Sequence, residues 1–205
     1  DDYTFCIITS PVGPYYSGSV KVKIEQEFTR ATGGGIGYTK AAGNYGGAFY
    51  PTSQAIKEGY NQVIWTDHKE HKYIEESGTM NLMLLIGDTF VTPPLTDRIL
   101  AGVTRRSIIT LVKEQGWAIE ERPVTVDEIV EAARTGALKE AFGMGTAAVV
   151  SQIDTIGHEG TNYSIPTPAD GKAMEIKRLL NDIRLGRTPD TNQWMVDVVQ
   201  PVTAE

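Results

Sequence analysis

Many short runs of β-branched and aromatic residues, with turn signals such as Gly87-Asp88 between them, most constrain the fold of this chain. Strands are predicted at 3–9, 20–24, 62–66, 72–75, 81–86, 89–92 and 118–122, with two more flanking 143–145. The helical patterns between them follow no regular βαβ repeat. No Gly-x-Gly-x-x-Gly sequence follows a strand and opens a helix, which disfavours a Rossmann domain. The sequence predicts a mixed α and β (α+β) fold.

Helices are predicted at 48–59, 104–115, 126–134 and 170–185. In the first, Pro51 is expected to bend the helix or delay its start. In the second, apolar residues recur on one face, so Arg105 and Arg106 should point outward. The third has Thr125 as its expected N-cap and Glu128 three positions later, which is a capping-box pattern.

Composition limits the class of protein. At 205 residues, 40% hydrophobic and 22% charged, the chain suits one sizeable globular domain. A net charge of −7 without a basic block argues against nucleic-acid binding. No apolar run approaches the roughly 20 residues of a membrane helix. A single cysteine, Cys6, excludes an internal disulfide and is compatible with a reducing compartment, so we expect a cytoplasmic protein.

One segment, 37–46, reads Gly-Tyr-Thr-Lys-Ala-Ala-Gly-Asn-Tyr-Gly and sets Lys40 among small residues, with Tyr45 five positions later. Small neighbours would let the lysine approach a planar cofactor closely and form a Schiff base. A lysine attacks a carbonyl only when neutral, so burial or a cationic neighbour should lower its pKa. Taken alone, the segment fits a solvated loop lysine better.

Further segments occur in a fixed order, at 73–82, 91–95, 99–105 and 142–148. Together with 37–46 they resemble branched-chain amino acid aminotransferases, which are pyridoxal-phosphate enzymes of fold-type IV. The resemblance runs from about Phe5 to Val199. It implies a β-barrel-like sheet core surrounded by helices.

The resemblance reaches only part of the family's length and implies the C-terminal large domain, with the N-terminal small domain missing. It divides the chain into a remnant of the small domain at 1–13, an interdomain loop with the strand leading into the large domain at 14–27, and the cofactor-binding domain at 28–205. An apolar surface that includes Phe5 and Ile7 should then be exposed.

The family's motifs assign roles to three residues. Lys40 would form the Schiff base and move the proton in catalysis. The register Glu-x-Gly-Thr-Met-Asn selects Glu76 as the carboxylate beside the pyridine nitrogen. Strand alternation then leaves Glu75 as an outward-facing charge. The hydroxyl of Tyr45 would bind the phenolic oxygen of the cofactor. The ordinary alternatives are a solvated strand end for the two glutamates and a packing role for Tyr45.

The start of the second predicted helix resembles the family's phosphate site. Gly102 allows close backbone approach, and free N–H groups at Val103 and Thr104 lie at the positive end of the helix dipole. The Thr104 hydroxyl could also cap the helix, which is its ordinary role. Leu100 resembles the residue that packs on the cofactor ring, and is otherwise a core residue.

The substrate side is assigned by the same resemblance. Thr146 would bind the phosphate and, with Ala147, the substrate carboxylate; the alternative is a plain tight turn. Tyr15, in the predicted interdomain loop, is placed in the substrate pocket. Asp67, His68 and His71 could suggest a metal site. They lie in a charged stretch that is better explained as a solvated turn, and no third convergent ligand is evident.

The function implied is transamination of leucine, isoleucine or valine with 2-oxoglutarate, so the partners are amino acids and 2-oxo acids. A homo-oligomer is expected. One alternative is a catalytically incompetent structural or dimerising domain, because the missing domain supplies an arginine to the phosphate and a wall of the substrate pocket. Another is a different fold-type IV enzyme, D-amino acid aminotransferase or aminodeoxychorismate lyase. This chain alone should be weak or inactive.

Overall fold

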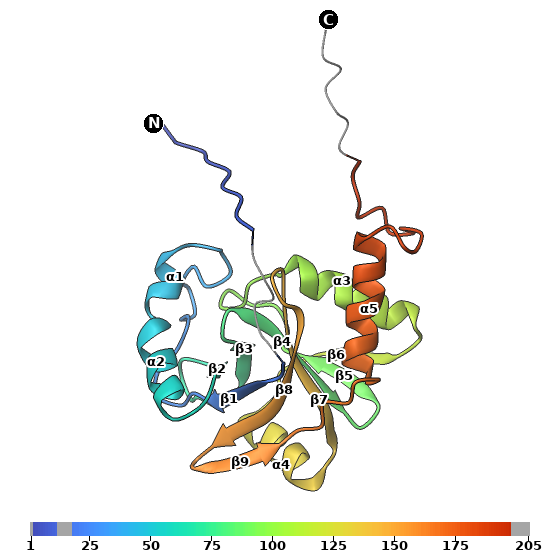
Figure 1. Ribbon diagram of the computed structural model, residues 1–205. Helices are drawn as coiled ribbons and strands as arrows, with labels where there is room; N and C mark the ends of the chain where they lie inside the picture. Colours follow the sequence, from blue (N-terminus) through green and yellow to red (C-terminus); the bar gives the residue numbers. More distant parts are fainter. Residues whose placement is uncertain (1, 12–17, 198–205) are drawn as a thin grey trace, which may run out of the picture.

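The computed structural model describes residues 2–11 and 18–197, and its strands form one sheet (Figure 1). The strands are β1 (Val20–Ile24), β2 (Gln62–Thr66), β3 (Ile74–Ser77), β4 (Met80–Ile86), β5 (Thr89–Thr92), β6 (Ala118–Glu121), β7 (Leu138–Gly145), β8 (Val149–His158) and β9 (Thr161–Ser164). The helices are α1 (Gly43–Gly46), α2 (Phe49–Lys57), α3 (Val103–Glu114), α4 (Val126–Thr135) and α5 (Lys172–Arg184).

Six of the strands close into a barrel. They pair in the order β3-β2-β1-β8-β7-β4, and β4 pairs back with β3. The closing pair is antiparallel, with Glu76 opposite Asn81 and Ser77 opposite Met80. The turn between these strands needs Gly78, whose φ of 57° lies in the left-handed region. The expected mixed α and β fold with a barrel-like core is confirmed.

The alternation of side chains along β4 separates two apolar cores. Leu82 and Leu84 join the cluster that includes residues of β1, β8 and α4. Met83 and Leu85 point the other way and pack with α3 and α5. Because both faces of this strand are covered, its sequence is apolar at almost every position. Figure 1 shows α3 and α5 together on one side of the barrel, and α1 and α2 on another.

Helix α2 explains how Pro51 is accommodated. The helix begins at Phe49, so Pro51 is its third residue. An N–H in the first turn has no intrahelical acceptor, and the one that proline lacks would have been unpaired in any case. The expected delay of the helix start is therefore wrong. The Thr125 cap of α4 is confirmed, because its Oγ1 accepts from the Glu128 N–H at 3.0 Å.

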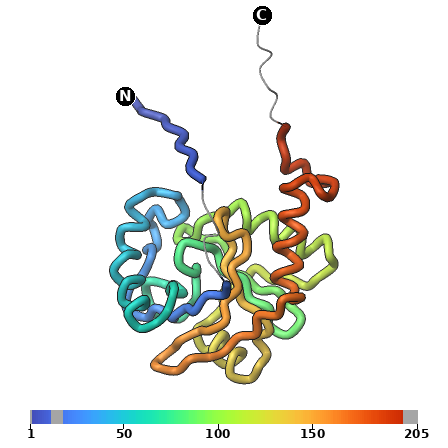
Figure 2. The backbone as a smooth tube through the Cα atoms, viewed as in Figure 1, coloured from blue at the N-terminus to red at the C-terminus, as the bar shows by residue number. Residues whose placement is uncertain are grey.

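Two expectations about individual segments are wrong. Residues 2–11 form no strand in the described part of the chain, and Tyr3 and Phe5 are almost fully exposed. An extended segment becomes a strand only when it pairs with another. Figure 2 shows this segment running away from the body of the molecule. Arg105 does not point outward but is buried, because its guanidinium donates to the Pro93 carbonyl and pairs with Glu121.

Among the described residues, the helices are all too short or too polar to cross a membrane.

Candidate active site

A cavity of about 600 Å³ lies where the ends of β3, β4 and β7 meet the start of α3. Its lining contains most of the residues that the sequence assigned to a cofactor site: Lys40, Glu76, Leu100, Gly102, Val103, Thr104, Thr146 and Ala147. These residues come from four separate stretches of the sequence. Of the other predicted site residues, Tyr45 is not part of the lining, and Tyr15 lies outside the described residues.

Lys40 enters the cavity from the glycine-rich loop before α1. The side chain is exposed, so burial, one of the two expected ways to activate the lysine, is not seen. Its Nζ lies 5.5 Å from the centroid of the Tyr45 ring, which is the range of a cation–π contact. The loop is fixed behind the lysine, because the Tyr38 N–H donates to the Asp97 carbonyl at 3.0 Å.

Glu76 projects from β3 and is 4% exposed. Its Oε1 accepts from the Leu100 N–H at 2.9 Å and from the Asn81 amide at 3.2 Å. Its Oε2 lies 2.9 Å from the Nε atom of Arg30. Burial raises the pKa of Glu76 to about 7, although Arg30, the Leu100 N–H and Lys40 favour the carboxylate. The group therefore sits near the point where its charge changes at neutral pH.

Glu75 is not the outward-facing charge that strand alternation suggested. It is buried at 3% exposure, and its carboxylate pairs with the Arg98 guanidinium. Burial raises its pKa, against the stabilising effect of Arg98. Both faces of β3 are covered, so alternation separates the two acids without exposing either of them. Only Glu76 lines the cavity.

The start of α3 forms one wall of the cavity. Gly102 is the N-cap residue, and no side chain caps this end, so the expected capping role of Thr104 is wrong. Thr104 is instead the second residue of the helix. The Val103 and Thr104 N–H groups belong to the first turn, where intrahelical acceptors are lacking, and both residues line the cavity. This wall can accept an anion.

Thr146 and Ala147 form the turn between β7 and β8 and are both exposed. They face the same cavity as Val103 and Thr104. Gly145 keeps this wall thin, since a Cβ at that position would come within 3.2 Å of the Met80 side chain. The turn therefore lies close to the floor that β4 provides.

Two residues of this site were missed in the sequence. Arg30 is buried and lies against Glu76. Asn81 bridges two elements: its Nδ2 donates to Glu76 Oε1 and to the Leu100 carbonyl at 2.9 Å. Asn81 was present in the Gly-Thr-Met-Asn motif and could have been singled out as a polar residue in an apolar strand. No local pattern marks Arg30.

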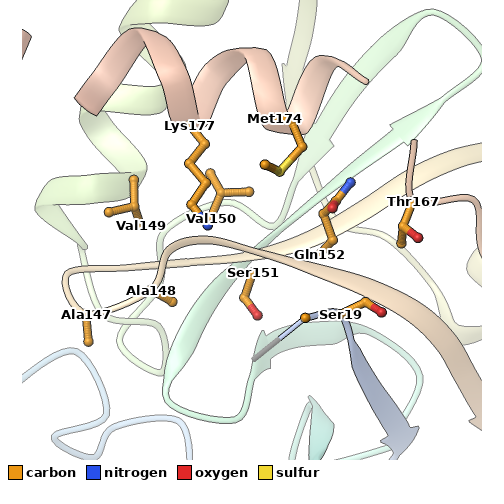
Figure 3. Close-up of a pocket in the computed structure, with 11 residues that line it drawn as sticks. Ser19, Ala147, Ala148, Val149, Val150, Ser151, Gln152, Thr167, Met174 and Lys177 are labelled. Carbon is orange, nitrogen blue, oxygen red and sulfur yellow. The ribbon is translucent and has the colours of Figure 1, made fainter. Parts of the chain in front are cut away.

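A second cavity, of about 420 Å³, shares Ala147 and Ala148 with the first. Figure 3 shows Met174 and Lys177 reaching toward it from α5, with Ser151 and Gln152 on the strand below. The lining contains neither Lys40 nor Glu76. The chemistry expected from the sequence therefore belongs to the cavity around Lys40.

The turn at 67–72 has a structural role. Asp67 is buried, and its carboxylate accepts from the N–H groups of Lys69, Glu70, Lys72 and Tyr73. Burial opposes ionisation, but these four bonds hold the pKa of Asp67 below its usual value. The expected solvated turn is wrong at Asp67. Within the described residues, no three metal-ligating side chains gather at this turn or elsewhere.

The barrel, the lysine loop, the buried carboxylate and the open helix start thus meet at one cavity. Comparison with known proteins shows the family to which the chain belongs. The model of the family described as "Amino-transferase class IV" matches residues 2–156. The chain therefore belongs to the class IV aminotransferase family.

Within this family, the chain is similar to individual branched-chain aminotransferases. A probable branched-chain-amino-acid aminotransferase of Staphylococcus aureus (strain N315) is 41% identical over 201 residues, covering 96% of this chain and 56% of the relative. The solved structure of the branched-chain amino acid aminotransferase from Escherichia coli has a TM-score of 0.74 and 26% identity, covering 89% of this chain and 58% of that one. The resemblance inferred from the motifs is confirmed.

A third protein shares the fold. The branched-chain amino acid aminotransferase from Thermobaculum terrenum, solved in its PLP form, has a TM-score of 0.68 and 24% identity, covering 83% of this chain and 52% of that one. The chain thus spans little more than half the length of the relatives it matches.

Proposed function

We propose that the protein containing this chain transfers the amino group of leucine, isoleucine or valine to 2-oxoglutarate, using pyridoxal phosphate bound in the cavity around Lys40. The observation that carries the proposal is the cavity itself. It brings a lysine, a buried carboxylate and the start of α3 together from distant parts of the sequence. The relatives' names support the choice of branched-chain substrates.

The residues present fit this cofactor. The uncapped N-terminus of α3 offers donors to a phosphate, and the Thr146 hydroxyl lies on the same cavity. Glu76 can accept from a protonated ring nitrogen, and Leu100 offers an apolar surface to the ring. A side chain in place of Gly102 would collide with Asn81, so the backbone there stays open to a ligand. Pyridoxal phosphate, when bound, supplies the electron sink for amino-group transfer.

The remaining roles fall to the chain's own residues. Lys40 would hold the cofactor covalently through Nζ, and its freed amine would move a proton to and from the substrate. The carboxylate of Glu76 would keep the ring nitrogen protonated. The Tyr45 hydroxyl would donate to the phenolic oxygen. The Ala147 N–H would orient the substrate carboxylate, and Tyr15 would help to enclose the side chain.

We infer further that this chain alone turns over weakly or not at all. Lys40 and Thr146 are exposed, so the cavity does not exclude water. The chain also spans only 56% of the S. aureus relative. A folded but inactive domain is therefore the alternative in the isolated state. A cytoplasmic location and a homo-oligomer stay predictions.

The first test is an absorption spectrum of the purified chain with added pyridoxal phosphate, before and after borohydride. A band that borohydride converts into a stable adduct on the Lys40 peptide, found by mass spectrometry, would support the site. Lys40→Ala should abolish the adduct. Lys57→Ala is the matched control, because Lys57 is an exposed lysine on α2 and lies outside the cavity lining. An adduct on other lysines only would contradict the proposal.

Substrate class is tested on the full-length protein. Leucine with 2-oxoglutarate should give glutamate, measured by a coupled dehydrogenase assay. D-Alanine in place of leucine tests for a D-amino acid aminotransferase, and aminodeoxychorismate tests for a lyase. Turnover of either of these at a rate above that of leucine would overturn the assignment to branched-chain substrates.

A further inference from the structure

The guanidinium of Arg30 lies at the junction of three segments that surround the cavity. Its side chain is only 5% exposed. Nε lies 2.9 Å from Oε2 of Glu76. The terminal Nη2 donates to the Gly37 carbonyl at 3.1 Å and to the Arg98 carbonyl. One buried cation thus contacts the carboxylate and two loops.

Each of these three segments carries a group assigned to the cofactor. Gly37 precedes Lys40 by three residues. Arg98 precedes Leu100 by two, and the Leu100 N–H itself donates to Glu76. The loops have little room to shift, because a Cβ on Gly37 would come within 2.4 Å of the Ala31 Cβ and 2.9 Å of the Arg98 backbone. Arg30 therefore links the positions of the lysine loop, the ring-packing loop and the carboxylate.

Charge in this region is arranged so that Glu76 depends on Arg30. The neighbouring acid, Glu75, raises the pKa of Glu76. The second arginine nearby, Arg98, is engaged by Glu75 and Asp97. Lys40 is the remaining cation that favours the Glu76 carboxylate. Because Lys40 is also the residue proposed to attach the cofactor, Arg30 is the cation that stays beside Glu76 throughout.

The Nε atom of Arg30 does not use its hydrogen-bonding capacity. Among the described residues, the buried Nε–H has no hydrogen-bond partner, although Nε lies close to Glu76 Oε2. The contact is therefore an ion pair whose geometry is not a good hydrogen bond.

We propose that Arg30 is a positioning residue that favours the ionised form of Glu76, aims its carboxylate into the cavity, and fixes the Lys40 and Leu100 loops around it. The proposal deepens, and rests on, the proposed function, because it explains how a carboxylate buried at 4% exposure can serve a protonated ring nitrogen. Without the arginine, burial favours the neutral acid, which cannot stabilise a positive charge on the ring.

The test measures the titration of Glu76 in the protein without cofactor, so it does not depend on turnover. Carboxyl ¹³C NMR, with Glu76→Gln identifying the signal, gives the midpoint for the wild type and for Arg30→Met. We expect the midpoint to rise by about 1–3 pH units in Arg30→Met, which is a tenfold or larger gain in proton affinity. An unchanged midpoint in a folded variant would overturn the proposal.

Arg105→Met is the matched control. Arg105 is also buried, pairs with a glutamate and donates to a backbone carbonyl. The control should lose stability yet leave the Glu76 midpoint in place. If Arg30→Met does not fold, Arg30→Lys keeps the charge but loses the fork. Its midpoint should stay close to that of the wild type, while hydrogen exchange at the Tyr38 N–H becomes faster. Unaltered exchange would contradict the loop-fixing role.

The two proposals can fail separately. If pyridoxal phosphate forms no adduct on Lys40 but the Glu76 midpoint still depends on Arg30, the proposed function fails and the control of Glu76 by Arg30 stands. If the adduct forms and Arg30→Met leaves the Glu76 midpoint unchanged, the proposed function stands and the role of Arg30 is rejected.

Discussion

Helices α3 and α5 both begin after a glycine N-cap, yet their first turns are used differently. At α5, the carboxylate of Glu140 accepts from the Lys172 N–H at 2.8 Å and from the Ala173 N–H at 3.0 Å. At α3, no side chain caps the helix, and its first residues line a cavity. One helix start is satisfied by the protein's own acid. The other is available to an anion from outside.

The two glycines show the same contrast. A Cβ on Gly171 would come within 2.7 Å of the Glu140 carboxylate, so glycine there makes room for the capping acid. A Cβ on Gly102 would come within 2.2 Å of Asn81 Oδ1. Asn81 does not cap α3 but holds Glu76 and the Leu100 carbonyl. The difference between a capped and an uncapped helix start thus lies in the neighbour that each glycine admits.

The largest expected effect removes the cap of α5. Glu140→Ala leaves two N–H groups in the first turn of α5 without their charged acceptor. We expect a loss of about 3–5 kcal/mol in the free energy of unfolding, because charge-assisted bonds to a buried carboxylate are lost together. Urea unfolding followed by circular dichroism measures this loss.

The same variant checks the separation of the two helix starts. The spectrum of bound pyridoxal phosphate should not change in folded Glu140→Ala, because Glu140 is not part of the Lys40 cavity lining. A large fall in cofactor affinity, without a matching loss of folded protein, would show that the two helix starts are coupled and that the comparison is wrong.

Glu76 should make the free energy of unfolding fall as pH rises. Its pKa rises from 4.5 to about 7 on folding, because burial disfavours the charged form. A raised pKa means that the folded state holds the proton more tightly. The contribution to stability is fully present below pH 4.5 and is lost as pH rises through about 7. The total is about 3 kcal/mol.

The Glu76→Gln variant isolates the contribution of Glu76 to the pH dependence of stability. The free energy of unfolding is measured in urea from pH 4.5 to 8 for the wild type and for Glu76→Gln. As pH rises, the wild type should lose stability relative to Glu76→Gln. Carboxylates that do not interact with Glu76 cancel in this difference. A flat difference across the window would mean that folding does not raise the pKa of Glu76, and that Arg30 compensates its burial fully.

The fold could largely be predicted, because period and turn chemistry are local. The expected helix at 48–59 is found at Phe49–Lys57, and the strand at 62–66 is found unchanged. The errors at Glu75 and at residues 2–11 share one cause, which is tertiary contact. Glu75 was placed outside because alternation was taken to mean exposure, but a closed barrel covers both faces of β3. Residues 2–11 have strand-like composition but no strand.

The residues of the candidate site were likewise predicted only where a local motif marks them. Lys40, Glu76 and Thr146 were found because each lies in a motif of the family. Arg30 was missed, since its partner Glu76 is 46 positions away in the numbering and nothing beside it in the sequence signals a buried ion pair. Burial itself was also unpredictable, as Lys40 proves exposed and Arg105 buried.

The smallest expected effect comes from a substitution that makes the start of α3 resemble the start of α5. Val103→Asp places a carboxylate at the first residue of α3, where Val103 is 67% exposed, and so imitates the acid that α5 already has. The negative charge at the positive end of the helix dipole should raise the free energy of unfolding by about 0.3–1 kcal/mol at low salt. It should also repel the phosphate, weakening pyridoxal phosphate by about five- to tenfold. Val103→Asn, of the same size but neutral, separates charge from shape. If Val103→Asp instead tightened cofactor binding while Val103→Asn did not, the start of α3 would not be the phosphate site, and its likeness to an anion-binding helix would be superficial.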